Sequence, residues 1–114
     1  MRLELAKYFH DVQRAARTLS GFVNGKSWAD YERDAMLRAA VERQFEIIGE
    51  ALAQLAKRDP TLAGRIREYR QIIAFRNILI HGYAEVDDRL VWDMVQSRLS
   101  VLLQQADDLL APPT

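Results

Sequence analysis

The sequence predicts an all-α fold, an antiparallel bundle of four to five helices that occupies residues 1–114 as a single domain. Three long segments place apolar residues three or four positions apart, which is the spacing of one face of an α-helix. No segment alternates apolar and polar residues for long enough to indicate a strand. A chain of 114 residues has the length of one domain, and short connections between long helices favour antiparallel packing.

The first helix is expected from about residue 2 to the Ser20-Gly21 region. A turn that contains Gly25 should follow it, because glycine interrupts helical patterns. The apolar stripe of this helix alternates spacings of three and four and consists of Leu5, Phe9, Val12, Ala16, Leu19 and Phe22.

The second helix is expected to begin after Ser27 and to end near Lys57. Ser27 can accept a hydrogen bond from an amide of the first turn, and Asp30 stands at the third helical position, as in a capping box. The proline of Asp59-Pro60 lacks an amide donor and stops the pattern. The apolar stripe is Leu37, Val41, Phe45, Ile48, Leu52 and Leu55.

The last helix is expected to begin at the Asp87-Asp88 pair, because acidic side chains stabilise the positive N-terminal end of a helix. Pro112-Pro113 should end it. Its apolar stripe is Val91, Val95, Leu99, Leu102, Ala106 and Leu109.

A shorter and more apolar helix is expected over residues 69–83, at the centre of the packing. On a helical wheel of about 100° per residue, Arg76 and Tyr83 lie inside its apolar arc, whereas Asn77 and His81 share a flank. A guanidinium on the buried side of a helix is costly unless it is paired or lies in a cleft. The other members of the arc are Ile72, Phe75, Ile78, Leu79 and Ile80.

The charge composition excludes a generally cationic nucleic-acid-binding surface, because sixteen basic and sixteen acidic residues give a net charge of zero. Any contact with nucleic acid must therefore be local. Residues 57–76 hold six basic and two acidic side chains, a net charge of +4, and residues 85–93 have a net charge of −3. An ordinary solvated surface explains such segments equally well.

The sequence has no cysteine, which excludes disulfides, thiolate metal sites and a cysteine nucleophile, and which fits a reducing cytoplasm. It has no signal-peptide pattern and no apolar run near the roughly 20 residues of a membrane span, so we expect a cytoplasmic protein without a membrane partner. The histidines show no metal-binding spacing, and five single glycines form no phosphate loop. We therefore expect neither a metal nor a nucleotide cofactor.

The two histidines differ in their surroundings. His10 falls on the polar side of the first helix and is expected to be an ordinary surface residue. His81 follows Arg76 by five positions and Asn77 by four. Histidine titrates near neutral pH, and arginine offers a planar fork to phosphate oxygens. Arg76 and His81 are therefore candidate catalytic residues for cleavage of an RNA phosphodiester, with Asn77 in support.

Cleavage without a metal needs a base for the 2′-hydroxyl and an acid for the leaving 5′-oxygen, and a single histidine supplies only one of them. A homodimer in which the 69–83 helices meet across a two-fold axis would bring two copies of His81 and Arg76 into one groove. The alternative is structural: Arg76 pairs with Glu46 or Glu50 of the second helix, and His81 caps the end of its own helix.

One motif and several further segments carry a family resemblance. The motif is Arg-x4-His-x-Tyr, formed by Arg76, His81 and Tyr83. The other segments are Ser20-Gly21-Phe22, Asp34-Ala35 with Arg38, Ile47-Ile48-Gly49-Glu50-Ala51 and Val91-Trp92-Asp93. In this order they cover nearly the whole chain, which resembles the HepT-like group of HEPN-domain toxins. Tyr69 stands where that group usually has a tryptophan before the motif helix.

The resemblance implies a HEPN-like bundle and a metal-independent endoribonuclease that works as a homodimeric toxin in a type II-like toxin–antitoxin system. It implies Arg76 and His81 as the catalytic pair in a shared cleft, with Asn77 as the supporting polar residue. It also implies neutralisation by a cognate minimal nucleotidyltransferase antitoxin that transfers AMP to Tyr83. An adenylyl phosphate beside Arg76 would occupy the anion site and repel RNA.

Two other functions would use the same residues differently. A non-catalytic subunit would bind a nucleotide or a substrate for a nucleotidyltransferase partner in the same groove. A purely structural adaptor would need neither Arg76 nor His81, so their substitution would have no effect. The sequence leaves these alternatives to the ribonuclease toxin open.

Overall fold

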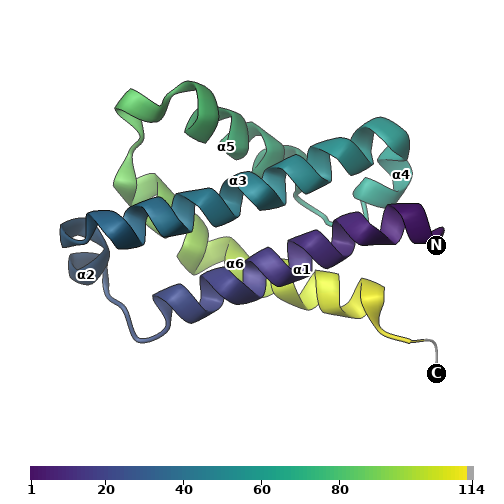
Figure 1. Ribbon diagram of the computed structural model, residues 1–114, viewed down its shortest axis with the longest axis horizontal. Helices are drawn as coiled ribbons and strands as arrows, with labels where there is room; N and C mark the ends of the chain where they lie inside the picture. The colour runs from purple at the N-terminus through teal and green to yellow at the C-terminus, as the bar shows by residue number, and fades with distance from the viewer. Residues whose placement is uncertain (113–114) are drawn as a thin grey trace.

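The computed structural model describes residues 1–112, apart from the side chain of Tyr83, and within that range it is helical and contains no strand (Figure 1). The helices are α1 (Leu3–Val23), α2 (Trp28–Arg33), α3 (Ala35–Arg58), α4 (Pro60–Ala63), α5 (Tyr69–His81) and α6 (Asp88–Leu110), and the 3-10 helix η1 (Tyr83–Glu85) lies between the last two. The all-α prediction is confirmed.

Helix α3 lies at the centre of the arrangement. Figure 1 shows α1 and α3 side by side and running in opposite directions, with α5 on the other side of α3 from α1. Helix α6 packs mainly against α1, and α5 lies along one edge of the bundle with α3 as its main packing partner. The predicted antiparallel bundle is therefore found, but α5 is at its edge rather than at its centre.

The apolar stripes predicted for the three long helices form most of the core. The α3 stripe from Leu37 to Leu55 is buried at all six positions. The α1 stripe is buried except for Phe22, which lies in the last turn and is 37% exposed. The prediction was also wrong for Ile78 of α5, which is 47% exposed because α5 is covered on one face only.

The long helix expected after Ser27 is interrupted at Asp34, where the backbone leaves the helical region with φ of −113° and ψ of 97°. The Asp34 carboxylate accepts a hydrogen bond from the Leu37 amide at 3.1 Å and thereby caps α3. A short acidic side chain favours a cap over a helix interior, which explains the break. The capping box at Ser27 and Asp30 is confirmed and starts the short helix α2.

The remaining helix ends follow the predicted signals with two differences. Gly25 has a φ of 74°, in the left-handed region that glycine tolerates, and turns the chain after α1. Asp59 ends α3 but also caps α4, a short helix that the sequence did not predict. Helix α5 ends at His81 instead of residue 83. Asp87 caps α6 as expected, whereas Pro113 lies outside the described residues.

An aromatic cluster joins α2 to the start of α6. The ring of Tyr31 is fully buried, 5.2 Å from the ring of Trp92 and 6.2 Å from that of Trp28. Burial raises the pKa of the Tyr31 hydroxyl, and burial together with the nearby Asp88 raises the pKa of the Glu42 carboxyl. This cluster fixes the first turns of α6 against α2. None of the helices in residues 1–112 has both the length and the apolarity needed to cross a bilayer.

Candidate functional site

Helix α5 presents one face to α3 and the other to solvent. Ile72, Phe75 and Leu79 are buried in the interface with α3. The Phe75 ring meets the Phe45 ring of α3 edge to face, with the ring centres 5.2 Å apart. Backbone hydrogen bonding continues through His81, and the amide of Gly82 then donates to the Ile78 carbonyl at 2.8 Å and closes the helix.

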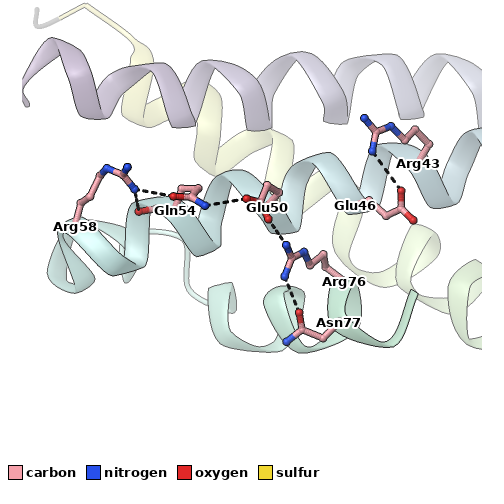
Figure 2. A network of polar contacts seen from close by, with 7 residues as sticks. All are labelled: Arg43, Glu46, Glu50, Gln54, Arg58, Arg76 and Asn77. Atoms are coloured by element: carbon pink, nitrogen blue, oxygen red, sulfur yellow. Dashed lines mark hydrogen bonds and ion pairs between the residues drawn. The ribbon is translucent and has the colours of Figure 1, made fainter. Parts of the chain in front are cut away.

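Arg76 lies on the border of this buried face, and its side chain is 22% exposed. Its Nη2 atom forms an ion pair with the Glu50 carboxylate of α3, and its Nη1 atom donates to Asn77 Oδ1 at 2.8 Å (Figure 2). The predicted need for a partner is thus met by Glu50. Glu46, the other candidate, lies 3.5 Å from Arg43 of its own helix instead.

The Glu50 carboxylate belongs to a line of polar side chains along α3. Gln54 Nε2 donates to Glu50 Oε1 at 2.9 Å, and Arg58 Nη1 donates to Gln54 Oε1 at 2.8 Å (Figure 2). The three α3 residues are spaced four apart, so they lie on one face of the helix beside α5. The network holds the carboxylate in place and, through it, the guanidinium of Arg76.

Gly49 permits the close approach of α3 and α5 at this point. A Cβ atom at Gly49 would lie 2.7 Å from Cγ of Arg76 and closer still to its Cβ. Any side chain here would therefore push Arg76 away from α3. Gly49 had no predicted role of its own, although an isolated glycine within the pattern of a long helix is a sign that another backbone or side chain packs closely against it.

His81 is exposed at the C-terminal end of α5, where it lines a shallow hollow with Gly82, Ala84 and Glu85. His81 lies in the last turn of α5, but its imidazole makes no hydrogen bond among the described side chains, so it does not cap the helix by a hydrogen bond as the structural alternative suggested. No hydrogen bond or ion pair joins Arg76 to His81 in the described part of the chain. The two residues share a helix, but a single chain does not bring them into contact. His10 is exposed on α1, as expected.

Asn77 follows Arg76 on α5 and lies on the same exposed face as His81. It is exposed together with Ala74, Ile78 and His81, and these four residues form one continuous stripe on the solvent side of α5. The predicted shared flank of Asn77 and His81 is confirmed. The Asn77 amide therefore contacts Arg76 on one side and faces the same solvent as His81 on the other.

Tyr83 follows the end of the helix. Its backbone belongs to η1, in which the Glu85 amide donates to the Gly82 carbonyl at 2.9 Å. The side chain lies outside the described residues, so its expected role as the AMP acceptor stays a prediction. Within residues 1–112, no three histidine, aspartate or glutamate side chains are grouped so that they could hold a metal ion.

The family described as "Ribonuclease HepT-like" matches residues 12–109, a range that includes Gly49, Arg76 and His81. The chain belongs to the HepT-like ribonuclease family. This membership confirms the family inferred from the motif and the prediction that the chain is an RNA-cleaving enzyme.

Individual relatives of this HepT-like chain agree in length as well as in family. "Putative RNase TTE0752" of Caldanaerobacter subterraneus subsp. tengcongensis is 29% identical over 103 residues, which cover 90% of this chain and 91% of the relative. "Probable ribonuclease HepT" of Thermococcus cleftensis is 30% identical over 95 residues, 83% of this chain and 86% of the relative. "Putative RNase MJ1380" of Methanocaldococcus jannaschii is 24% identical over 108 residues. No solved structure matches the chain.

The packing at Gly49 leads to a stability prediction. Gly49→Ala places a methyl group against Arg76, and overpacking of this kind typically costs about 1–3 kcal/mol. We expect the variant to unfold at a lower urea concentration than the parent and to lose the Arg76–Glu50 contact in a crystal structure.

Gly21→Ala is the matched control, because Gly21 also lies in a helix but has no atom within 4 Å of the position of an added Cβ. Alanine forms helices better than glycine, so this variant should be as stable as the parent or more stable by up to about 1 kcal/mol. Equal stability of the two variants would contradict the role given to Gly49.

Proposed function

We propose that this chain is a metal-independent endoribonuclease toxin of a type II-like toxin–antitoxin system, with Arg76 and His81 as its catalytic residues and Asn77 in support. The main support is the placement of Arg76. A permanently charged fork is held by Glu50 and Asn77 on the same helix that ends in an exposed histidine, in a chain of a ribonuclease family.

The proposed reaction begins with transfer of the 2′-hydroxyl proton to a His81 imidazole. The 2′-oxygen then bonds to the adjacent phosphorus, and the P–O5′ bond breaks as a second, protonated imidazole gives its proton to the leaving 5′-oxygen. The products are a cyclic phosphate and a free 5′-hydroxyl. Arg76 stabilises the negative charge that builds up on the phosphate oxygens between these steps, because its guanidinium stays charged at all working pH values.

The second imidazole must come from another molecule, since the chain has only one histidine near Arg76. We therefore include a homodimer in the proposal. The stripe of Ala74, Asn77, Ile78 and His81 is exposed, and it includes Ile78, which is 47% exposed in the single chain. A two-fold contact through this stripe would cover Ile78 and would place the α5 helices of the two chains opposite each other.

A non-catalytic binding subunit is the second candidate. It is favoured by the engagement of Arg76 with Glu50 and by the lack of contact between Arg76 and His81 in one chain. Such a subunit would present a nucleotide or a substrate to a nucleotidyltransferase partner. It would bind RNA or nucleotide through Arg76 without cleaving it, so a cleavage assay separates the two functions.

Regulation by the nucleotidyltransferase antitoxin completes the proposal. The helix ends at His81, and only Gly82 separates Tyr83 from it, so the proposed acceptor follows the proposed catalytic histidine by two positions in the sequence. The phosphate of an attached AMP would then compete with RNA for Arg76. The absence of a large side chain at Gly82 would give the modifying enzyme access to the backbone at this point.

The first prediction from the proposed function concerns catalysis. Arg76→Ala and His81→Ala should each lower RNA cleavage by at least about 100-fold, because each removes a group that acts in the transition state. Glu50 is 47% exposed, so leaving it unpaired should not unfold the protein. The assay is cleavage of a labelled RNA by purified, unmodified protein in the presence of a chelator, with circular dichroism to check the helical content.

His10→Ala is the control for catalysis, and it should cleave like the parent because His10 is exposed on α1. Full activity of His81→Ala would remove the role proposed for that residue. Absence of cleavage by the parent protein, together with nucleotide binding that depends on Arg76, would favour the binding subunit instead.

The second prediction concerns assembly. The chain should sediment as a dimer at micromolar concentration, and Ile78→Glu should shift it to a monomer because a charge would be buried in the contact. The same variant should lose RNA cleavage while keeping its helical content. A monomeric parent with full activity would exclude the shared cleft.

The third prediction concerns Tyr83. Co-expression with the cognate nucleotidyltransferase should add one or more AMP units to Tyr83 and suppress RNA cleavage, whereas Tyr83→Phe should remain active because it lacks the acceptor hydroxyl. Intact-mass spectrometry of the co-expressed protein checks this. An inactive but unmodified protein would mean that the partner inhibits by covering the site.

A further inference from the structure

The basic side chains of the chain differ in whether they have an acidic partner. Within residues 1–112, the following lie within ion-pair distance of a carboxylate: Arg2, Arg17, Arg33, Arg38, Arg43, Arg76, Arg89 and Arg98. Among the described residues, none of the five basic side chains in residues 57–70 has such a partner. The positive charge of that segment is therefore not neutralised within the fold.

The two acidic residues of the same segment have other partners. The Asp59 carboxylate accepts the Leu62 amide at 3.0 Å and caps α4. The Glu68 carboxylate forms an ion pair with Arg98 of α6 at 2.5 Å. Neither of them neutralises the neighbouring Arg65, Arg67 or Arg70.

The connection between α4 and α5 holds two of these arginines in place. Ile66 is fully buried, and its amide donates to the Ala63 carbonyl at 3.0 Å. Arg65 and Arg67 flank it in the sequence and are both exposed. An anchored residue between two exposed ones fixes the backbone from which the arginines project. These arginines are therefore attached to an ordered surface and not to a loose loop.

Helix stability does not explain this arrangement. Lys57 and Arg58 lie in the last turn of α3, where positive charge stabilises the helix. Arg70 lies in the first turn of α5, and Arg65 and Arg67 lie just before it, where positive charge is unfavourable. The first turn of α5 has no acidic residue, and the carboxylate of Glu68 at its N-cap is paired with Arg98. These three arginines are therefore available to a ligand of opposite charge.

We propose that Arg65, Arg67 and Arg70 form a contact surface for the phosphate backbone of RNA, next to the cleavage site. Arg70 precedes Arg76 by six residues, which corresponds to about 9 Å along the helix axis. An RNA strand whose scissile phosphate lies at Arg76 thus reaches the three arginines within a few nucleotides. The contacts are to phosphate and carry no sequence preference.

This inference rests on the proposed function, because it takes RNA to be the ligand at Arg76. It also accounts for the neutral composition of the chain. An RNA strand that continues beyond the reacting phosphate can gain binding energy from a local group of unpaired cations near Arg76. The protein as a whole does not need a positive net charge for this. Long RNA should accordingly be a better substrate than a dinucleotide, which cannot span the distance.

The test compares two double variants with the same change of charge. Arg65→Gln with Arg67→Gln removes two arginines of the surface and leaves Arg70, which packs over the Tyr69 ring, untouched. Arg14→Gln with Lys26→Gln is the control, because both residues are exposed and neither has a carboxylate partner in the described part of the chain. Binding of a labelled single-stranded RNA is measured by fluorescence anisotropy over a series of salt concentrations, and cleavage of the same RNA and of a dinucleotide is measured in parallel.

Counterion release predicts a slope of about 0.7 in log affinity against log salt for each phosphate contact of a single strand. The Arg65/Arg67 variant should therefore lose about 1.4 of that slope and on the order of tenfold in affinity at physiological salt. The control should keep the affinity and slope of the parent, and both variants should cleave the dinucleotide like the parent.

Three results would overturn the inference. They are an unchanged slope in the Arg65/Arg67 variant, an equal loss in both double variants, and unchanged RNA binding together with loss of the complex with the nucleotidyltransferase, which would reassign the surface to a protein partner. Failure of the proposed function would look different. RNA binding that depends on Arg65 and Arg67 without any cleavage by the parent protein would support the surface and contradict the catalytic proposal.

Discussion

The geometry of the site depends on how closely α3 and α5 approach each other at Gly49. Because α3 has no side chain there, the aliphatic part of Arg76 packs directly on its backbone, and the guanidinium reaches Glu50. One turn away on α3, the Phe45 and Phe75 rings hold the same two helices together. Close backbone packing resists displacement more strongly than a partly exposed ion pair does. The arginine is therefore placed by the shape of the helix interface, and the ion pair only orients its tip.

A phosphate that binds at Arg76 has to share the guanidinium with a carboxylate or displace it. Glu50 is 47% exposed and accepts a second hydrogen bond from Gln54, so water and an amide can stabilise it when Arg76 turns to another anion. Because the ion pair is partly exposed to solvent, replacing the Glu50 carboxylate by another anion at Arg76 costs little free energy. A chain without net charge can in this way keep the Arg76 guanidinium ordered until another anion replaces Glu50.

Helical periodicity was sufficient to predict the long helices, because α1, α3 and α6 each bury a stripe with that spacing. It could not reveal the break at Asp34, since the predicted stripe begins only at Leu37 and the break is made by the local competition of a capping side chain. At the site, the sequence correctly indicated that Arg76 needs a partner. It could not choose between Glu46 and Glu50, which are four residues apart on one face of α3. The choice depends on where Gly49 brings the helices together, and that is a property of the tertiary structure.

The end of α5 at Gly82 has a mechanical consequence. The hydrogen bond from the Gly82 amide to the Ile78 carbonyl completes the helix, and the backbone that follows belongs to a separate short turn. A change of conformation or of bulk after this glycine is not transmitted along the hydrogen-bonded ladder to Arg76, which is held from the side by α3. The segment after the helix and the arginine before it can thus vary independently, so that the surroundings of His81 can change without loosening Arg76 from its place.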